Sequence, residues 1–182
     1  YGRNANNNLP LVVVPTGGKL RGIHYKSPVA SAQVKSAILL AGLYADAPTT
    51  VTEPYVSRDH TEQMLAGFGV RIERSGTSVT VFPVEDGGYC APDEITVPGG
   101  ISSAAYFLVA GSIIKDSRLR LNNVGINPTR TGILDVLREM GAHISVQNER
   151  ESGGECVADL FVESASLHGV SFGAEIMPRL ID

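Results

Sequence analysis

Apolar residues follow first a helical and then a strand pattern in the early part of the chain. Eight of the twelve positions from 32 to 43 are apolar and lie nearly all round a helix, which predicts a helix that is buried on most faces. Ser31, directly before this run, is a typical N-cap residue. The β-branched run Thr49 to Thr52 then predicts a strand, because such side chains fit a pleated surface.

A second helix is predicted from Asp59 to a stop at Gly69, and its apolar residues form one stripe. Glu62, three residues after Asp59, predicts a capping box. Short strands are expected around these helices, at residues 23–25, 70–72 and 78–82.

The same order of elements returns later in the chain. A shift of seventy-two positions places residues 31–72 on residues 103–144 without a gap. The second copy predicts a helix capped by Ser102 or Ser103 and a helix opened by Asn127-Pro128. Its expected strands are residues 94–97, 119–122, 142–146 and 157–162.

Strands that alternate with helices predict an α+β fold made from two copies of one unit. Pro98-Gly99-Gly100 separates the copies, so the chain divides into residues 1–98 and 99–182. Glycine accepts backbone angles that other residues avoid, so this stretch suits either a hinge or an ordinary tight turn.

Composition and charge exclude several classes of protein. No apolar run approaches the ~18 residues of a membrane span, and the net charge of −4 argues against a nucleic-acid partner. The first 45 residues carry +5 and the rest −9, which suits either a small anionic ligand or a solvated basic face. Cys90 and Cys156 are far apart, so we expect free thiols in a reducing cytoplasm.

Residues that could bind a small anion lie at the start of the first predicted helix. Backbone N–H groups at a helix start are unpaired and the helix dipole is positive there, so Ser31-Ala32-Gln33 with nearby Arg58 forms a candidate anion site. Ordinary capping by Ser31 and a surface Arg–Asp pair are the competing interpretations. The four histidines have no metal-ligand spacing, so we expect no metal and no cofactor.

Four longer blocks carry a resemblance, at residues 31–45, 57–65, 100–108 and 125–142. They resemble the 5-enolpyruvylshikimate-3-phosphate synthase family, in the form common in Gram-positive bacteria. The resemblance implies repeated βαβαββ units of the enolpyruvyl transferase fold, of the inside-out α/β barrel type, in a fragment of a two-lobed protein. It implies that residues 1–98 belong to the shikimate 3-phosphate lobe, residues 99–182 to the phosphoenolpyruvate side, and residues 98–100 to the hinge. Gly100 stands where the family usually has Asp.

The resemblance also implies site residues. The phosphate-binding motif falls on Ser31, Ala32 and Gln33, Arg58 matches a basic residue used against the phosphate, and Asp182 matches an essential carboxylate that is a candidate base.

The implied reaction moves the enolpyruvyl group of phosphoenolpyruvate to the 5-hydroxyl of shikimate 3-phosphate and releases phosphate. It needs neither metal nor cofactor. Segments that supply most of the phosphoenolpyruvate site have no counterpart here, so we expect the chain to be inactive without the remaining segments of the same enzyme. The alternatives are a non-catalytic folding unit or scaffold and a piece of a UDP-N-acetylglucosamine enolpyruvyl transferase.

Overall fold

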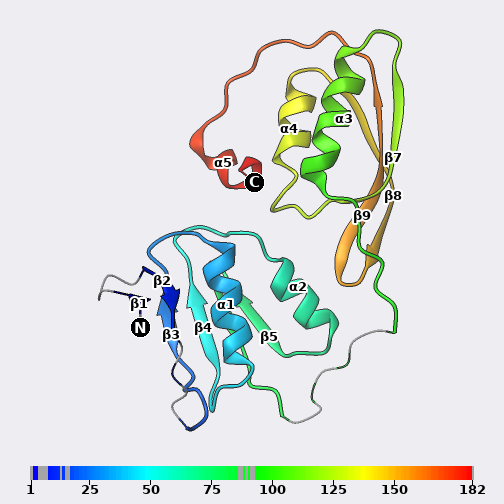
Figure 1. Ribbon diagram of the computed structural model, residues 1–182. Coiled ribbons are helices and arrows are strands. Elements are labelled where there is room, and N and C mark those ends of the chain that lie inside the picture. The colour runs from blue at the N-terminus through cyan, green and yellow to red at the C-terminus, as the bar shows by residue number, and fades with distance from the viewer. Residues whose placement is uncertain are drawn as a thin grey trace.

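The computed structural model describes residues 2–3, 8–12, 14, 17–85, 88, 90 and 93–181. It contains two layered units joined by one long connection (Figure 1). We call residues 23–82 the first unit and residues 99–163 the second unit. A short hairpin of β1 (Gly2–Arg3) and β2 (Asn8–Leu11) precedes them. A 3₁₀ turn (Ala174–Ile176) and α5 (Met177–Leu180) follow them.

The first unit is a four-stranded sheet with two helices on one face (Figure 1). Its strand order is β3-β4-β6-β5, in which only β3 and β4 are parallel. The strands are β3 (His24–Lys26), β4 (Thr49–Thr52), β5 (Ile72–Ser75) and β6 (Ser78–Val81), and the helices are α1 (Ala32–Gly42) and α2 (His60–Gly67). Leu39, Val51 and Val81 are fully buried between the two layers.

The second unit repeats this plan with the strand order β7-β9-β8. Its elements are α3 (Ile101–Ile113), β7 (Arg118–Gly125), α4 (Gly132–Glu139), β8 (His143–Ser152) and β9 (Glu155–Glu163). Gly99 forms a parallel bridge with Val124, in the place that β3 takes beside β4. The predicted repeat and the α+β class are therefore confirmed. The strand expected at 94–97 is wrong, because only this single bridge forms there.

A single offset for the repeat is also wrong. The second helices, α2 and α4, are seventy-two positions apart as predicted, and Gly69 and Gly141 both end them with positive φ. The first helices are sixty-nine positions apart. Leu39 matches Leu108, since both are fully buried, and Gly42 matches Gly111. A Cβ at either glycine would meet a valine of the last strand.

Two predicted helix starts and one predicted capping box need correction. Gly100, not Ser102 or Ser103, is the N-cap of α3. Asn127 opens a turn rather than a helix, because its side-chain oxygen accepts hydrogen bonds from the backbone N–H and hydroxyl of Thr129. The capping box at Asp59 and Glu62 does not form, because Glu62 turns into the core instead.

The first helix of each unit is less covered than its sequence predicts. Only one face of α1 or α3 packs on its sheet, so Leu40 of α1 is 47% exposed and Tyr106 of α3 is 80% exposed. The expectation of burial on most faces is therefore wrong for the chain as described.

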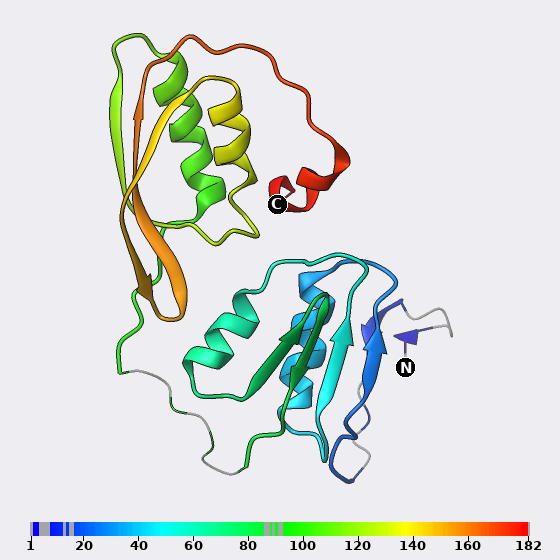
Figure 2. The same ribbon diagram turned by 180° about the vertical axis from the view of Figure 1, so that it is seen from behind.

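The two units touch at one end of each sheet. The turn between β8 and β9 lies against α2, and a Cβ at Gly154 would stand 2.9 Å from the carbonyl oxygen of Gln63. The α5 segment packs beside α4, and both views place it on the side of the second unit that faces the first (Figure 2). Among the described residues, no helix combines the length and apolarity needed to cross a membrane.

Candidate functional site

A small open cavity of about 240 Å³ brings the two units together. The cavity is lined by the start of α1, by the start of α2 together with the residue two places before it, and by the segment before α4. Its lining residues are Ala32, Gln33, Ser36, Arg58, His60, Thr61 and Arg130. We call it the anion cavity, because two arginines and a helix N-terminus face one space with no carboxylate among the lining residues.

Helix α1 supplies the backbone part of this site. Its first turn contains no acidic residue, so the helix itself places no carboxylate beside the positive end of its dipole. Ser31 is its N-cap, but the Ser31 hydroxyl accepts from the Val34 N–H at 3.4 Å, which is a long bond. Ser31 itself is not among the lining residues, whereas the next two residues are.

Three of the four predicted binding residues therefore meet in one cavity: Ala32, Gln33 and Arg58. Ser31 caps the helix behind them. Asp182, the predicted base, lies outside the described residues.

Sequence reasoning missed Arg130, His60 and Thr61. Arg130 had a signal, because the seventy-two-residue offset of the second helices places Arg58 on Arg130. Each arginine lies two residues before the second helix of its unit, and both reach the same cavity. The repeat thus supplies one cation from each unit.

A buried ion cluster lies behind the anion cavity. Lys35 Nζ is 3.0 Å from Glu53 Oε2 and 2.8 Å from Glu62 Oε1, and none of the three side chains is more than 3% exposed. Such a cluster is unexpected from sequence, because lysine and glutamate are almost never buried unless they are paired.

Asp59 connects the units next to the anion cavity. Its Oδ1 accepts a hydrogen bond of 2.7 Å from the Asn127 amide of the second unit. Its Oδ2 accepts from Gln63 at 3.1 Å and from Arg74 at 3.2 Å within the first unit. This carboxylate fixes the segment that carries Arg58 relative to the segment that carries Arg130.

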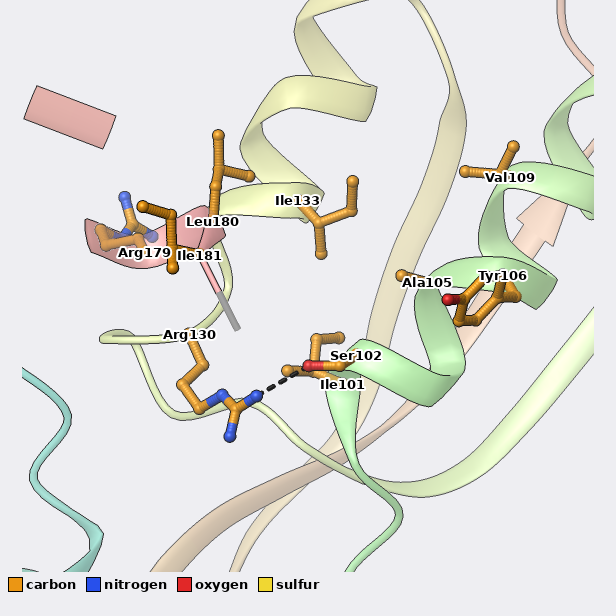
Figure 3. A pocket seen from close by; sticks show the side chains of 10 residues that line it. All are labelled: Ile101, Ser102, Ala105, Tyr106, Val109, Arg130, Ile133, Arg179, Leu180 and Ile181. Carbon is orange, nitrogen blue, oxygen red and sulfur yellow. Dashed lines mark hydrogen bonds between the residues drawn. The ribbon is translucent and has the colours of Figure 1, made fainter. Parts of the chain in front are cut away.

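A second cavity, of about 360 Å³, lies between α3, α4 and α5 (Figure 3). Most of its lining is apolar, including Ile101, Val109 and Ile133. Arg130 also borders it and donates a 2.7 Å hydrogen bond to the Ser102 hydroxyl (Figure 3). Arg179 is committed to Pro128 O and Asp135. The anion cavity is therefore the better candidate for polar chemistry.

No group of three or more His, Cys, Asp or Glu side chains within the described ranges is arranged to hold a metal ion. Both cysteines are free and exposed.

Comparison with known proteins identifies the family. The family model described as EPSP synthase (3-phosphoshikimate 1-carboxyvinyltransferase) matches residues 1–182. Two relatives carry the name 3-phosphoshikimate 1-carboxyvinyltransferase: one from Desulforudis audaxviator is 56% identical and one from Bacillus subtilis is 52% identical, each over 100% of this chain. The match spans 41% of either relative, so the chain covers about two fifths of their length.

The solved EPSP synthase of Acinetobacter baumannii has the same fold. It superposes with a TM-score of 0.82 at 44% sequence identity, over 88% of this chain and 36% of that one. This likeness confirms the predicted enolpyruvyl transferase fold for a fragment. The chain belongs to the EPSP synthase (3-phosphoshikimate 1-carboxyvinyltransferase) family.

Proposed function

We propose that this chain is part of a transferase that moves the enolpyruvyl group of phosphoenolpyruvate to the 5-hydroxyl of shikimate 3-phosphate. The family membership supports the reaction, and the anion cavity is the observation in this structure that supports the substrate. In this proposal the cavity binds the phosphate of shikimate 3-phosphate. The first unit then belongs to the lobe for that substrate, and the second unit to the phosphoenolpyruvate side, with the hinge at residues 98–100.

The lining residues have distinct roles in the proposed site. The N–H groups at the start of α1, including that of Ala32, donate to phosphate oxygens, and the Gln33 amide adds a donor and an acceptor. Arg58 supplies a planar guanidinium that matches two phosphate oxygens. Arg130 adds a second cation from the other unit, so the bound anion favours contact between the units.

The proposed chemistry is an addition followed by an elimination. The 5-hydroxyl oxygen attacks C2 of phosphoenolpyruvate, its proton passes to a base, and C3 gains a proton. Loss of the C3 proton and of phosphate then restores the double bond. Asp182 is the proposed base. The chain spans two fifths of its relatives, so we expect turnover to need the segments that those relatives have in addition.

We also propose the cytoplasm as the location of the protein. The two free thiols are consistent with a reducing compartment.

Isothermal titration of the chain with shikimate 3-phosphate tests the proposal. We expect millimolar or tighter binding, and a weakening of about tenfold or more in Arg58→Ala, since hydrogen bonds to charged groups contribute about 1.5–3 kcal/mol. Arg130→Ala is expected to act in the same direction. Arg118→Ala removes an arginine that is 84% exposed and pairs with Glu163, so it is the matched control and should bind as the wild type does.

Each alternative predicts a different outcome of this titration. A scaffold would show no binding and no thermal shift with shikimate 3-phosphate. A sugar-nucleotide transferase would bind UDP-N-acetylglucosamine in preference. Binding that Arg58→Ala leaves unchanged would contradict the assignment of the anion cavity.

A further inference from the structure

The buried cluster of Lys35, Glu53 and Glu62 has an asymmetry that suggests a role. Glu62 accepts no hydrogen bond from the described residues, so its contact with Lys35 is an ion pair alone. Glu53 is instead fully engaged. Its Oε1 accepts from the Ser31 backbone N–H at 2.9 Å, its Oε2 lies 3.0 Å from Lys35 Nζ, and both oxygens lie 2.8 Å from the Ser57 hydroxyl.

Two of the three partners of Glu53 are neighbours in sequence of residues that line the anion cavity. Ser31 directly precedes Ala32 and Gln33, and Ser57 directly precedes Arg58. One carboxylate therefore ties the first turn of α1 to the segment that carries Arg58. Lys35 reinforces the tie, because its Nζ also lies 3.4 Å from the Ser57 carbonyl oxygen.

The second unit shows that this fold does not need the charges. By the offsets of the helices, Lys35 matches Ala104 and Glu62 matches Leu134, and both of these apolar residues are buried in the second core. Burying ions costs free energy that their attraction often fails to recover, and apolar replacements are often as stable. The first unit thus keeps a costly arrangement at the position next to the anion cavity.

We propose that Glu53, held by Lys35, is a positioning residue for the anion cavity. It sets the separation between the N–H groups at the start of α1 and the guanidinium of Arg58, so that both reach one phosphate. The inference rests on the proposed function for the identity of the anion. The contact that carries it, from Ser31 N–H to Glu53, lies within the protein itself.

Glu53→Gln and Glu62→Gln form a matched pair of variants. Each removes one buried carboxylate from Lys35 and leaves it paired with the other, at equal charge and similar size. A glutamine at 53 has one acceptor oxygen for three donors, so Ser31 N–H, Ser57 or Lys35 loses its partner. A glutamine at 62 leaves all contacts to Ser31 and Ser57 in place.

Two measurements test whether Glu53 positions the anion cavity. The first is amide hydrogen exchange of Ser31 without ligand, which we expect to accelerate about tenfold in Glu53→Gln and to stay within about twofold in Glu62→Gln, since tenfold corresponds to about 1.4 kcal/mol. The second is titration with shikimate 3-phosphate, and with inorganic phosphate as a smaller probe. We expect about tenfold weaker binding in Glu53→Gln and little change in Glu62→Gln, whatever the two melting temperatures are.

Equal behaviour of the two variants in both measurements would overturn the proposal. If Glu53→Gln does not fold, Ser57→Ala removes one hydroxyl from the same tie, and unchanged Ser31 exchange and affinity in that variant would also overturn it. Failure of the wild-type chain to bind either probe would contradict the proposed function. Ser31 exchange would still decide whether Glu53 positions the helix start.

Discussion

The two units share the order of three strands, β4-β6-β5 and β7-β9-β8, but differ at one matched pair of positions between their helices. In the first unit Lys35 and Glu62 form an ion pair of 2.8 Å between α1 and α2. In the second, Ala104 and Leu134 stand at the matching positions of α3 and α4. The difference teaches that the repeat tolerates either a buried ion pair or apolar side chains at these positions, beside an otherwise apolar core. The ion pair lies next to the residues that line the anion cavity.

Lys35→Met tests the charged interior and should have the largest effect on stability. It leaves two buried carboxylates without their cation, and breaking a buried pair typically costs about 3–5 kcal/mol. Urea unfolding measures the loss. Arg118→Met, which disrupts an exposed pair with Glu163, is the control and should cost at most about 1 kcal/mol. A similar small cost for both would show that solvent reaches the cluster.

Leu134→Ala tests the apolar interior and should cost about 3 kcal/mol, through lost burial and the cavity left behind. Its effect should be local to the second unit. Hydrogen exchange should show lost protection in β9, with β4 protected as in the wild type. Equal loss in both units would mean that they unfold as one body, and the comparison of separate cores would then fail.

Local sequence signals predicted much of the repeat. The second helices, their glycine stops at Gly69 and Gly141 and the last hairpins lie close to where the residues placed them. Helix starts were less predictable, because packing and turn chemistry decided them. Asn127 favoured a turn with Thr129, and α3 began at Ile101, ahead of the serines expected to cap it.

The candidate site, too, was predictable only in part. A motif at a helix start pointed to Ala32, Gln33 and Arg58, which meet in one cavity. Arg130 was present in the repeat but became visible as a lining residue only through the packing of the two units. The tie from Glu53 to Ser31 joins residues twenty-two positions apart, and spacing along the chain carries no signal for it.

A triple variant, Lys35→Met with Glu53→Gln and Glu62→Leu, gives the first unit an interior without buried charge. It should be within about 1–2 kcal/mol of the wild type in urea unfolding, because apolar residues of similar volume often replace a buried ion cluster without loss. Its stability should thus clearly exceed that of Lys35→Met alone. A triple variant as unstable as the single one would mean that the charges shape the first unit in a way the second does not share.

Asp159→Asn should have the smallest effect, and it probes a feature that only the second unit has. The strands β7 and β8 are irregular between residues 121 and 124 and between 147 and 150, and Asn123 and Asn148 adopt positive φ there. Asp159 on the central strand accepts hydrogen bonds from the Asn148 amide, the Asn123 backbone N–H and Arg120, at 2.8–2.9 Å. These contacts, that of Asn148 most of all, hold the pKa of Asp159 well below its usual range.

Because the folded pKa is lowered, the charge of Asp159 stabilises the fold above its unfolded pKa of about 3.9 and stops doing so as the pH falls toward the folded value. Asp159→Asn should therefore lower the melting temperature at pH 7, and the difference from the wild type should shrink between about pH 4 and pH 2. Asp135→Asn, at an exposed pair with Arg179, is the control and should change the melting temperature little. A difference that stays constant down to pH 2 would show that the shape of the side chain, and not its charge, supports the two irregular strands.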